Sequence, residues 1–152
     1  MGAELFATAQ LSKSYIAVAS GVSDINRWEI NVPLGFDINS EIPIKMGPGA
    51  LAASTRFEVI ERFHRSMLVL AMPKGGRQHQ IRVHAWMSGF PLIGDKLYGQ
   101  PDSVFLDKHA RTAAQTKDLL GHWRHALHAL SIIHTELPTG VYAPLPCDWS
   151  EF

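Results

Sequence analysis

Residues 75–84 read Gly-Gly-Arg-Gln-His-Gln-Ile-Arg-Val-His, and residues 93–99 read Ile-Gly-Asp-Lys-Leu-Tyr-Gly. The two glycines interrupt the strand-like composition that precedes them. Behind them, residues 78–88 have helical periodicity, and Gly89 stands where a C-terminal cap belongs. The apolar side chains that could share the buried helical face are Ile81, Ala85 and Met87. The first stretch therefore predicts a glycine-rich turn that leads into a short helix.

Segments with strand composition lie on both sides of this helix. They are residues 14–20, 28–32, 55–63, 66–72 and 126–133. The third and fourth are separated only by His64-Arg65, which predicts a hairpin. Many strands with few helices favour an α+β fold over a doubly wound one, here with a mixed, largely antiparallel sheet.

Three segments are less regular. Residues 34–54 carry several glycines and prolines and predict an irregular excursion. Residues 103–123 are polar with scattered Ala and Leu, which favours a short helix and a loop. Residues 141–152 contain Pro144 and Pro146, so we expect an extended tail at a sheet edge.

The bulk composition is that of a globular protein. The 152 residues suffice for one core, and we expect residues 1–152 to form a single domain. Hydrophobic residues make up 46% and charged residues 18%, which argues against disorder. No apolar run has the length of a membrane span. Cys147 is the only cysteine, which excludes an intrachain disulfide and fits a reducing, cytoplasmic setting.

Charge is balanced overall but not along the chain. Fourteen Lys and Arg residues face fourteen Asp and Glu residues, so net charge gives no support for broad affinity to RNA. Residues 74–84, however, hold Lys74, Arg77, His79, Arg82 and His84 with no acid among them. This stretch predicts a local basic patch that could contact phosphates.

Six short motifs extend over nearly the whole chain. They are Lys13-Ser14-Tyr15-Ile16-Ala17, Ala53–Val59, Pro73–His84, Pro91–Gly99, Leu127-His128-Ala129, and Pro-Leu-Pro-Cys-Asp-Trp at 144–149. In content and order they resemble the motifs of the RluA-type pseudouridine synthases, which isomerise uridine within RNA. Unrelated folds have no reason to repeat all six in this order, so the resemblance is specific.

The resemblance implies a mechanism. Such an enzyme flips the target uridine from its stack, which costs a few kcal/mol. It then breaks the bond between N1 and the ribose, rotates the base and rejoins it through C5. An aspartate acts as nucleophile or charge stabiliser. No metal or cofactor is needed, because the uracil is both leaving group and acceptor. The expected partner is ribosomal or transfer RNA.

The resemblance also implies roles for single residues. Tyr15 should stack on the uracil near its C5 proton, and Leu127 should pack behind this ring and shape the pocket. Arg82 should pair with the catalytic aspartate and keep it ionised. Four residues of the basic segment should place the helix and meet the RNA backbone: Lys74, Arg77, His79 and Gln80. Taken singly, Tyr15 and Leu127 could be core residues and Arg82 a solvated helix residue.

The catalytic aspartate of the family lies upstream of these motifs in a His-Arg-Leu-Asp-like segment. No Arg-Leu-Asp occurs in this chain, and residues 1–12 resemble the helical stretch that follows that segment. We therefore expect the chain to be the C-terminal portion of a pseudouridine synthase catalytic domain that forms no pseudouridine alone. Asp95 belongs to a motif in which the resemblance gives it a turn or structural role.

A missing upstream part would have two physical consequences. Arg82 would lose its carboxylate partner and should turn to water, another acid or an anion, because an unpaired buried charge is costly. The sheet would also keep an exposed edge, which favours self-association or segment swapping.

Two other readings remain open. The first is a non-catalytic RNA-binding protein derived from the same fold, and an in-frame Arg-Leu-Asp upstream of the start codon would separate it from an enzyme fragment. The second is a metal-binding or metabolic protein, because His122, His125 and His128 are spaced three apart. The extended character of residues 126–133 would turn His125 and His128 to opposite faces, which speaks against this second reading.

Overall fold

A six-stranded antiparallel sheet forms the centre of the computed structural model, which describes residues 11–135 and 139–151. The order of its strands is β2-β5-β6-β1-β7-β8. Their bounds are β1 Leu11–Ser20, β2 Arg27–Ile30, β5 Ser54–Arg62, β6 Ser66–Lys74, β7 Leu127–His134 and β8 Val141–Tyr142. The predicted α+β class and the β5–β6 hairpin are confirmed, and every ladder of this sheet is antiparallel.

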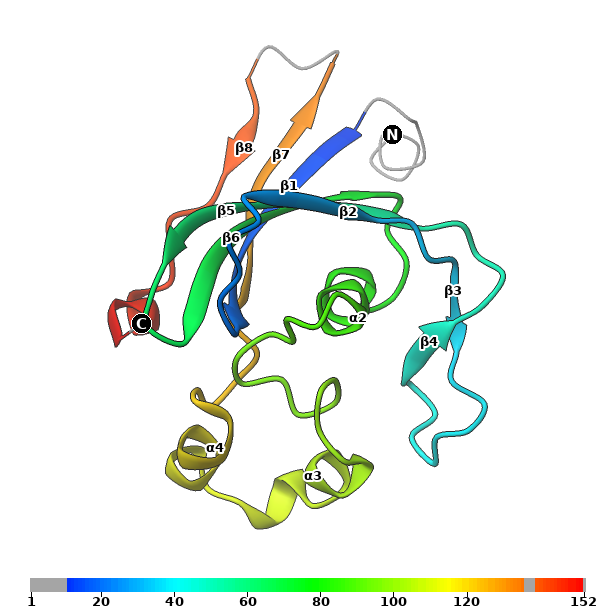
Figure 1. The fold of residues 1–152 in the computed structure, drawn as a ribbon, viewed down its shortest axis with the longest axis vertical. Coiled ribbons are helices and arrows are strands. Elements are labelled where there is room, and N and C mark those ends of the chain that lie inside the picture. Colours follow the sequence, from blue (N-terminus) through cyan, green and yellow to red (C-terminus); the bar gives the residue numbers. More distant parts are fainter. Residues whose placement is uncertain (1–10, 136–138, 152) are drawn as a thin grey trace.

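Helices cover one face of the sheet. The helix α2 (Gln80–Met87) lies directly beneath the strands, and α3 (Asp102–Leu106) and α4 (Ala113–Leu120) lie beyond it, as Figure 1 shows. A 3₁₀ turn at Lys108–Ala110 joins α3 to α4, and another at Cys147–Glu151 ends the chain. No helix in the described part of the chain is long and apolar enough to cross a membrane.

Three local expectations were wrong in detail, and a fourth falls mostly outside the described residues. Residues 34–54 are not wholly irregular, since β3 (Leu34–Phe36) and β4 (Met46–Pro48) pair as a separate small sheet beside α2 (Figure 1). Residues 103–123 hold two helices rather than one. The tail pairs with the sheet only at β8 and then turns into a 3₁₀ helix. The helical stretch expected for residues 1–12 lies outside the described residues except for Leu11 and Ser12, which belong to β1.

The start of α2 is set by a single residue. His79 has φ 54°, in the left-handed region, and it is the only non-glycine residue with positive φ among the described residues. Such a residue cannot continue a right-handed helix, so α2 begins at Gln80 and not at Gln78. The predicted buried face was also partly wrong, because Met87 packs with Val83 in another cluster than Ile81.

Alternation along β1 assigns its side chains to two cores. Ala17 and Ala19 join Ile81 and Ala85 of α2 in the main cluster, between the sheet and the helix. Ile16 and Val18 point to the opposite face, where they pack with Ala126 and Trp149. The part of β1 from Ile16 to Ala19 is thus buried on both faces.

The centre of the sheet splits into a fork. β1 and β6 pair from Ser20–Ser66 to Tyr15–Ala71, and beyond that row β1 pairs only with β7 and β6 only with β5. We call the gap between Leu11–Ser14 and Met72–Lys74 the fork. Pro73, which lacks an N–H, lies on its β6 side. In Figure 1 the upper ends of β1, β7 and β8 rise away from β5 and β6.

Candidate functional site

Tyr15 and Leu127 lie on the sheet face that α2 covers. Tyr15 belongs to the row at which the fork begins, and its partly buried ring packs against the main cluster. Leu127 is paired with Ala17 on the neighbouring strand and packs against the same cluster. Residues opposite each other in a ladder share a face, and Tyr15 and Ala17 share it by alternation. The structure therefore brings Tyr15 and Leu127 together beside α2.

Arg82 extends from α2 to a buried acid. Its Nε donates to Asp95 Oδ2 at 2.7 Å and its Nη2 donates to Asp95 Oδ1 at 2.8 Å. The side chain of Arg82 is 12% exposed and that of Asp95 is 0% exposed. Arg82 has therefore paired with another acid of this chain, one of the alternatives expected in the absence of the family's aspartate. This bidentate geometry fixes the plane of the guanidinium.

Asp95 also holds its own loop. Its Oδ1 accepts from the backbone N–H of Leu97 at 2.9 Å and of Tyr98 at 3.1 Å, the turn role expected for this motif. Burial by itself would raise the pKa of the Asp95 carboxyl, but hydrogen bonds and charge from Arg82, with these two N–H groups, lower it below the usual value. Asp95 is thus an ionised structural carboxylate with its oxygens occupied.

Tyr98 connects the arginine to the glycine-rich turn. The guanidinium of Arg82 lies 5.0 Å from the centroid of the Tyr98 ring. The Tyr98 hydroxyl accepts from Met46 N–H at 3.0 Å and lies 2.9 Å from His79 Nδ1. Because its oxygen accepts from Met46, its hydrogen is free to be donated to His79. Burial raises the pKa of Tyr98 to about 12.

His79 is neutral at pH 7. Burial lowers its pKa to about 4, and the charge of Arg82 acts in the same direction. An unprotonated Nδ1 is also what the hydroxyl of Tyr98 requires as an acceptor. The position of His79 fits the expected role in placing the helix, and a neutral imidazole can offer a phosphate a hydrogen bond from Nε2–H but no charge.

Gln80 stabilises the same turn from inside. It is 3% exposed, and its Nε2 donates to the carbonyls of Ser54 (2.9 Å) and Lys74 (3.1 Å). Its Oε1 accepts from the N–H of Arg77 at 3.0 Å. A buried amide with these partners has little left for a ligand. Placing the helix fits this position, and the expected contact of Gln80 with RNA does not.

His84 is not part of a surface patch, because its side chain is buried. It is fully buried, with Nε2 2.9 Å from the carbonyl of Val32 and Nδ1 2.8 Å from Thr55 Oγ1. A carbonyl oxygen only accepts hydrogen bonds, so the proton of His84 is on Nε2. The unprotonated Nδ1 then accepts from the hydroxyl of Thr55. Burial lowers the pKa of His84, against the opposing effect of the Val32 hydrogen bond. The expectation that His84 adds charge to a surface patch was wrong.

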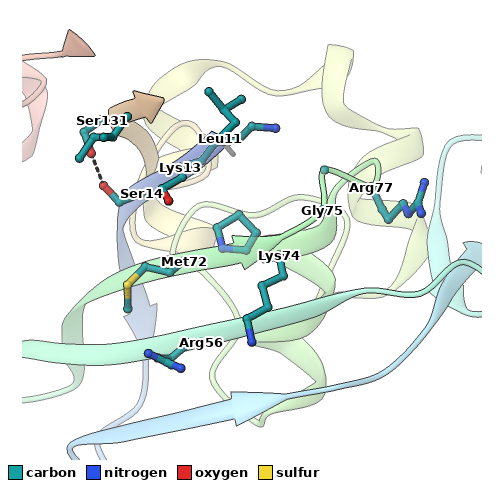
Figure 2. Close-up of a pocket in the computed structure, with 13 residues that line it drawn as sticks. Leu11, Lys13, Ser14, Arg56, Met72, Lys74, Gly75, Arg77 and Ser131 are labelled. Atoms are coloured by element: carbon teal, nitrogen blue, oxygen red, sulfur yellow. Dashed lines mark hydrogen bonds between the residues drawn. The ribbon is translucent and has the colours of Figure 1, made fainter. Parts of the chain in front are cut away.

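The other two basic residues line the fork. Lys74 and Arg77 are exposed and border a cavity of about 1080 Å³ that lies between the diverging strands. Figure 2 shows this cavity with Lys13 of β1 and Arg56 of β5 also at its wall. Tyr15, Arg82 and Leu127 are not among its lining residues, although Tyr15 adjoins the row that closes the fork.

Two of the three closely spaced histidines, His122 and His128, make different contacts. The ring of His122 is buried with Nδ1 2.9 Å from the carbonyl of Arg124. His128 is packed against Trp149, with ring centroids 6.2 Å apart. The described residues contain no group of three or more His, Cys, Asp or Glu that could hold a metal ion.

Comparison with known proteins supplies the family. The chain is 38% identical to a ribosomal large subunit pseudouridine synthase C from Vibrio vulnificus, over 92% of this chain and 42% of that protein. It is 35% identical to the dual-specificity RNA pseudouridine synthase RluA from Vibrio cholerae, over 68% of this chain and 43% of that protein. The chain belongs to the RluA-type pseudouridine synthase family.

The fold comparison agrees with this assignment. The structure of the human RNA pseudouridylate synthase domain containing 1 has a TM-score of 0.71 at 23% identity, covering 95% of this chain and 58% of that one. That likeness shows the pseudouridine synthase fold. No family model matches the chain. The chain spans about two fifths of the length of the curated pseudouridine synthases it matches.

The closing Pro-Leu-Pro-x-Asp-Trp motif of this chain has a visible structural role. Asp148 accepts from Arg124 Nε at 3.1 Å and Nη2 at 2.8 Å, and Trp149 packs beneath Val18. The 3₁₀ turn is thus attached to the segment that leads into β7. This segment also positions Leu127, so the last motif supports the site from the opposite face of the sheet.

Two cationic residues at the fork were not singled out from the sequence. Lys13 was noted only as part of the motif at 13–17, and Arg56 only as part of the motif at 53–59 and of a strand. Both reach the fork through strand pairing, Arg56 because it is opposite Met72. The only sequence signal for Arg56 was strand alternation. In a strand whose Phe57 faces the core, the neighbouring Arg56 must face the other side of the sheet.

Proposed function

We propose that this chain provides the uridine-holding part of an RNA pseudouridine synthase site. The observation that carries the proposal is the convergence of Tyr15 and Leu127 on the sheet face beside α2, in a chain that belongs to this family. The relatives are named as pseudouridine synthases, and three of them specifically as ribosomal large subunit enzymes. RNA is therefore the proposed substrate class.

In the proposed reaction the uridine leaves its stack and lies on the Tyr15 ring, with Leu127 behind it. The bond from N1 to C1′ of the ribose breaks, the uracil rotates, and a bond from C5 to C1′ forms. The proton on C5 is lost to a base and N1 takes up a proton, so the product is an isomer of the substrate. Stacking on Tyr15 offsets part of the few kcal/mol that flipping costs.

Arg82 is proposed to hold a catalytic carboxylate. A guanidinium has five N–H donors, and the two hydrogen bonds to Asp95 use two of them. The Nη1 group can thus receive a second carboxylate while Asp95 keeps the guanidinium in its plane. A largely buried arginine of this kind would favour the ionised form of that acid.

We further propose that the chain alone is catalytically incomplete. The carboxylate that Arg82 holds, Asp95, is fully buried, and its oxygens accept from Arg82 and two backbone N–H groups. It cannot reach the ribose of a flipped nucleotide without breaking these bonds. The acid that attacks or stabilises the ribose would therefore be another carboxylate.

Release of tritium from RNA labelled at C5 of uridine tests the proposal, because isomerisation replaces the C5–H bond. We expect release by the chain joined to the sequence encoded directly upstream of Met1, and none by the 152-residue chain. Tyr15→Phe and Arg82→Ala in the joined protein should abolish release. Tyr142→Phe on exposed β8 and Arg65→Ala at the hairpin turn are matched controls that should retain it.

Three outcomes would contradict parts of this proposal. Release by the 152-residue chain would overturn its incompleteness. Equal release by Tyr15→Phe and Tyr142→Phe would show that the Tyr15 hydroxyl has no role in the loss of the C5 proton, and would leave Tyr15 only the stacking of its ring. A joined protein that binds RNA but never releases tritium would favour the non-catalytic RNA-binding alternative. The complete burial of Asp95 is also compatible with that alternative.

A further inference from the structure

We propose that the fork between β1 and β6 binds the sugar–phosphate backbone of an RNA strand. This inference rests on the proposed function, because it names a second contact surface for the same RNA. It differs from the uridine site in its residues, since Tyr15, Arg82 and Leu127 do not line the cavity.

The charges at the fork suit a polyanion. Among the described residues that line the cavity, four carry cationic side chains and none is Asp or Glu: Lys13, Arg56, Lys74 and Arg77. They come from segments far apart in sequence that the sheet brings together. Lys74 has a 74% exposed side chain, so its ammonium can meet a ligand without a large desolvation cost. Such a group of cations releases condensed counterions when it neutralises phosphates.

The shape of the fork suits an extended chain of phosphates. Its volume of about 1080 Å³ exceeds the ~300–1,000 Å³ of a typical small-molecule site, which leaves room for more than one nucleotide. Gly75 and Gly76 form one wall, and a Cβ added at Gly76 would lie 3.3 Å from Lys13 Nζ. A backbone without side chains here lets a phosphate approach Lys13. Figure 2 shows Lys13 extending toward this turn.

The fork is continuous with the uridine site through Tyr15. This residue occupies the last row shared by β1 and β6, and the cavity begins with the next residue, Ser14. Each nucleotide carries its phosphate close to its base. A base stacked on Tyr15 would therefore direct the adjoining backbone into the fork. Phosphate contacts of this kind fix register and carry no sequence information.

An acidic residue next to the fork should weaken the binding of phosphates there. Glu29 on β2 is opposite Arg56 and lies 3.7 Å from Lys74 Nζ. A hydrogen bond from Ser54 and the charge of Lys74 lower the pKa of Glu29, so it is ionised at neutral pH. This carboxylate competes with a phosphate for Lys74 and Arg56. Its removal should strengthen binding to RNA.

The test is the salt dependence of binding of a labelled single-stranded RNA, measured by fluorescence anisotropy for the 152-residue chain. Arg56→Ala combined with Lys74→Ala should weaken binding. It should also reduce the slope of log K against log salt by about 1.4, at about 0.7 for each lost contact with a single strand. Arg65→Ala, exposed at the far end of the same hairpin, is the matched control and should leave the slope unchanged. Arg56 and Lys74 are both exposed, so their substitution should not destabilise the fold. Thermal unfolding of each variant verifies this.

Two further arms make the result decisive. An oligoadenylate, which has no uridine, should show the same loss in the double variant, because the fork contacts phosphates alone. Glu29→Gln should bind both RNAs more tightly than the unmodified chain. Equal slopes for the double variant and the unmodified chain would overturn the fork proposal, as would binding unaffected by Glu29→Gln.

Failure of this proposal and failure of the proposed function give different results. Tritium release by the joined protein, together with fork variants that bind RNA normally, would refute the fork and leave the enzyme assignment. Fork-dependent RNA binding with no tritium release would retain the fork and remove the catalytic assignment.

Discussion

The Arg82–Asp95 pair joins α2 to the loop that follows it. Removing one partner of such a buried pair leaves an uncompensated charge, which typically costs 3–5 kcal/mol. We predict that Asp95→Ala lowers the free energy of unfolding by about 3–5 kcal/mol, as measured by urea denaturation. Asp102→Ala breaks a more exposed pair with Lys45 and should cost about 1 kcal/mol or less.

The double variant Arg82→Ala/Asp95→Ala separates charge from packing. If the cost of Asp95→Ala comes from the stranded guanidinium, the double variant should lose less stability than the sum of the two single variants. Strict additivity of the two losses would contradict the pairing described above.

His79 should make stability depend on pH. Its pKa is about 4 in the folded chain, against 6.5 for an ordinary histidine, so the unfolded chain binds a proton more readily. Its contribution is complete above pH 6.5 and is lost as pH falls toward 4. We predict a shallower decline over this window for His79→Asn, since asparagine tolerates the left-handed backbone and does not titrate. Thermal unfolding across this range measures the effect.

The control for His79→Asn is His64→Asn in the exposed turn of the β5–β6 hairpin. It should leave the pH dependence as it is in the unmodified chain. An identical acid decline for His79→Asn would show that other groups, His84 among them, account for the loss.

The loop between α2 and α3 illustrates a constraint at the scale of one element. Gly94 has φ +74°, and a Cβ there would lie 2.0 Å from the carbonyl oxygen of Arg124. Gly89 has φ +85° with nothing within 4 Å of such a Cβ. Gly89→Ala should cost about 1–2 kcal/mol from backbone strain. Gly94→Ala should cost clearly more, because the chain before β7 must also move.

Urea denaturation of the two glycine variants measures this difference. If Gly94→Ala and Gly89→Ala were equally destabilised, the close approach of the loop to Arg124 would not constrain the fold.

Elements with one strong local signal were predictable from sequence. The β5–β6 hairpin was evident because two strand-like runs flank a two-residue turn. The small β3–β4 sheet was not, because strands of three residues rich in Gly and Pro carry no periodicity. The helix start was misplaced by two residues because a left-handed histidine is indistinguishable in sequence from a helical one.

The candidate site was predictable to the extent that its motifs are contiguous. Tyr15 and Leu127 were assigned to one site, and the structure places them on one face. The acid partner of Arg82 could not be named, because Asp95 is thirteen residues away and only the fold turns it inward. Gln80 and His84 looked available in sequence, and burial removed them from the surface.

At the scale of the whole molecule, the two edges of the main sheet are the short strands β2 and β8. Val141 and Tyr142 of β8 are 64% and 69% exposed, and an uncovered edge can pair with a second chain. We predict that the chain self-associates as its concentration rises, as measured by sedimentation equilibrium. Val141→Lys should weaken association, because charge at an edge opposes strand pairing.

Ile38→Lys serves as the control for this edge, since Ile38 is 92% exposed outside the main sheet. It should leave association unchanged. A clean monomer at high concentration would contradict the prediction for the edge.

The split in the central sheet has a mechanical consequence. The ladders β2-β5-β6 and β1-β7-β8 are joined by backbone pairing along only the six rows from Tyr15–Ala71 to Ser20–Ser66. Any molecule wedged into the open end pulls on the terminal row first, and Tyr15 occupies that row. An RNA strand seated in the fork would therefore also shift the Tyr15 ring, because both act on the same row of the ladder.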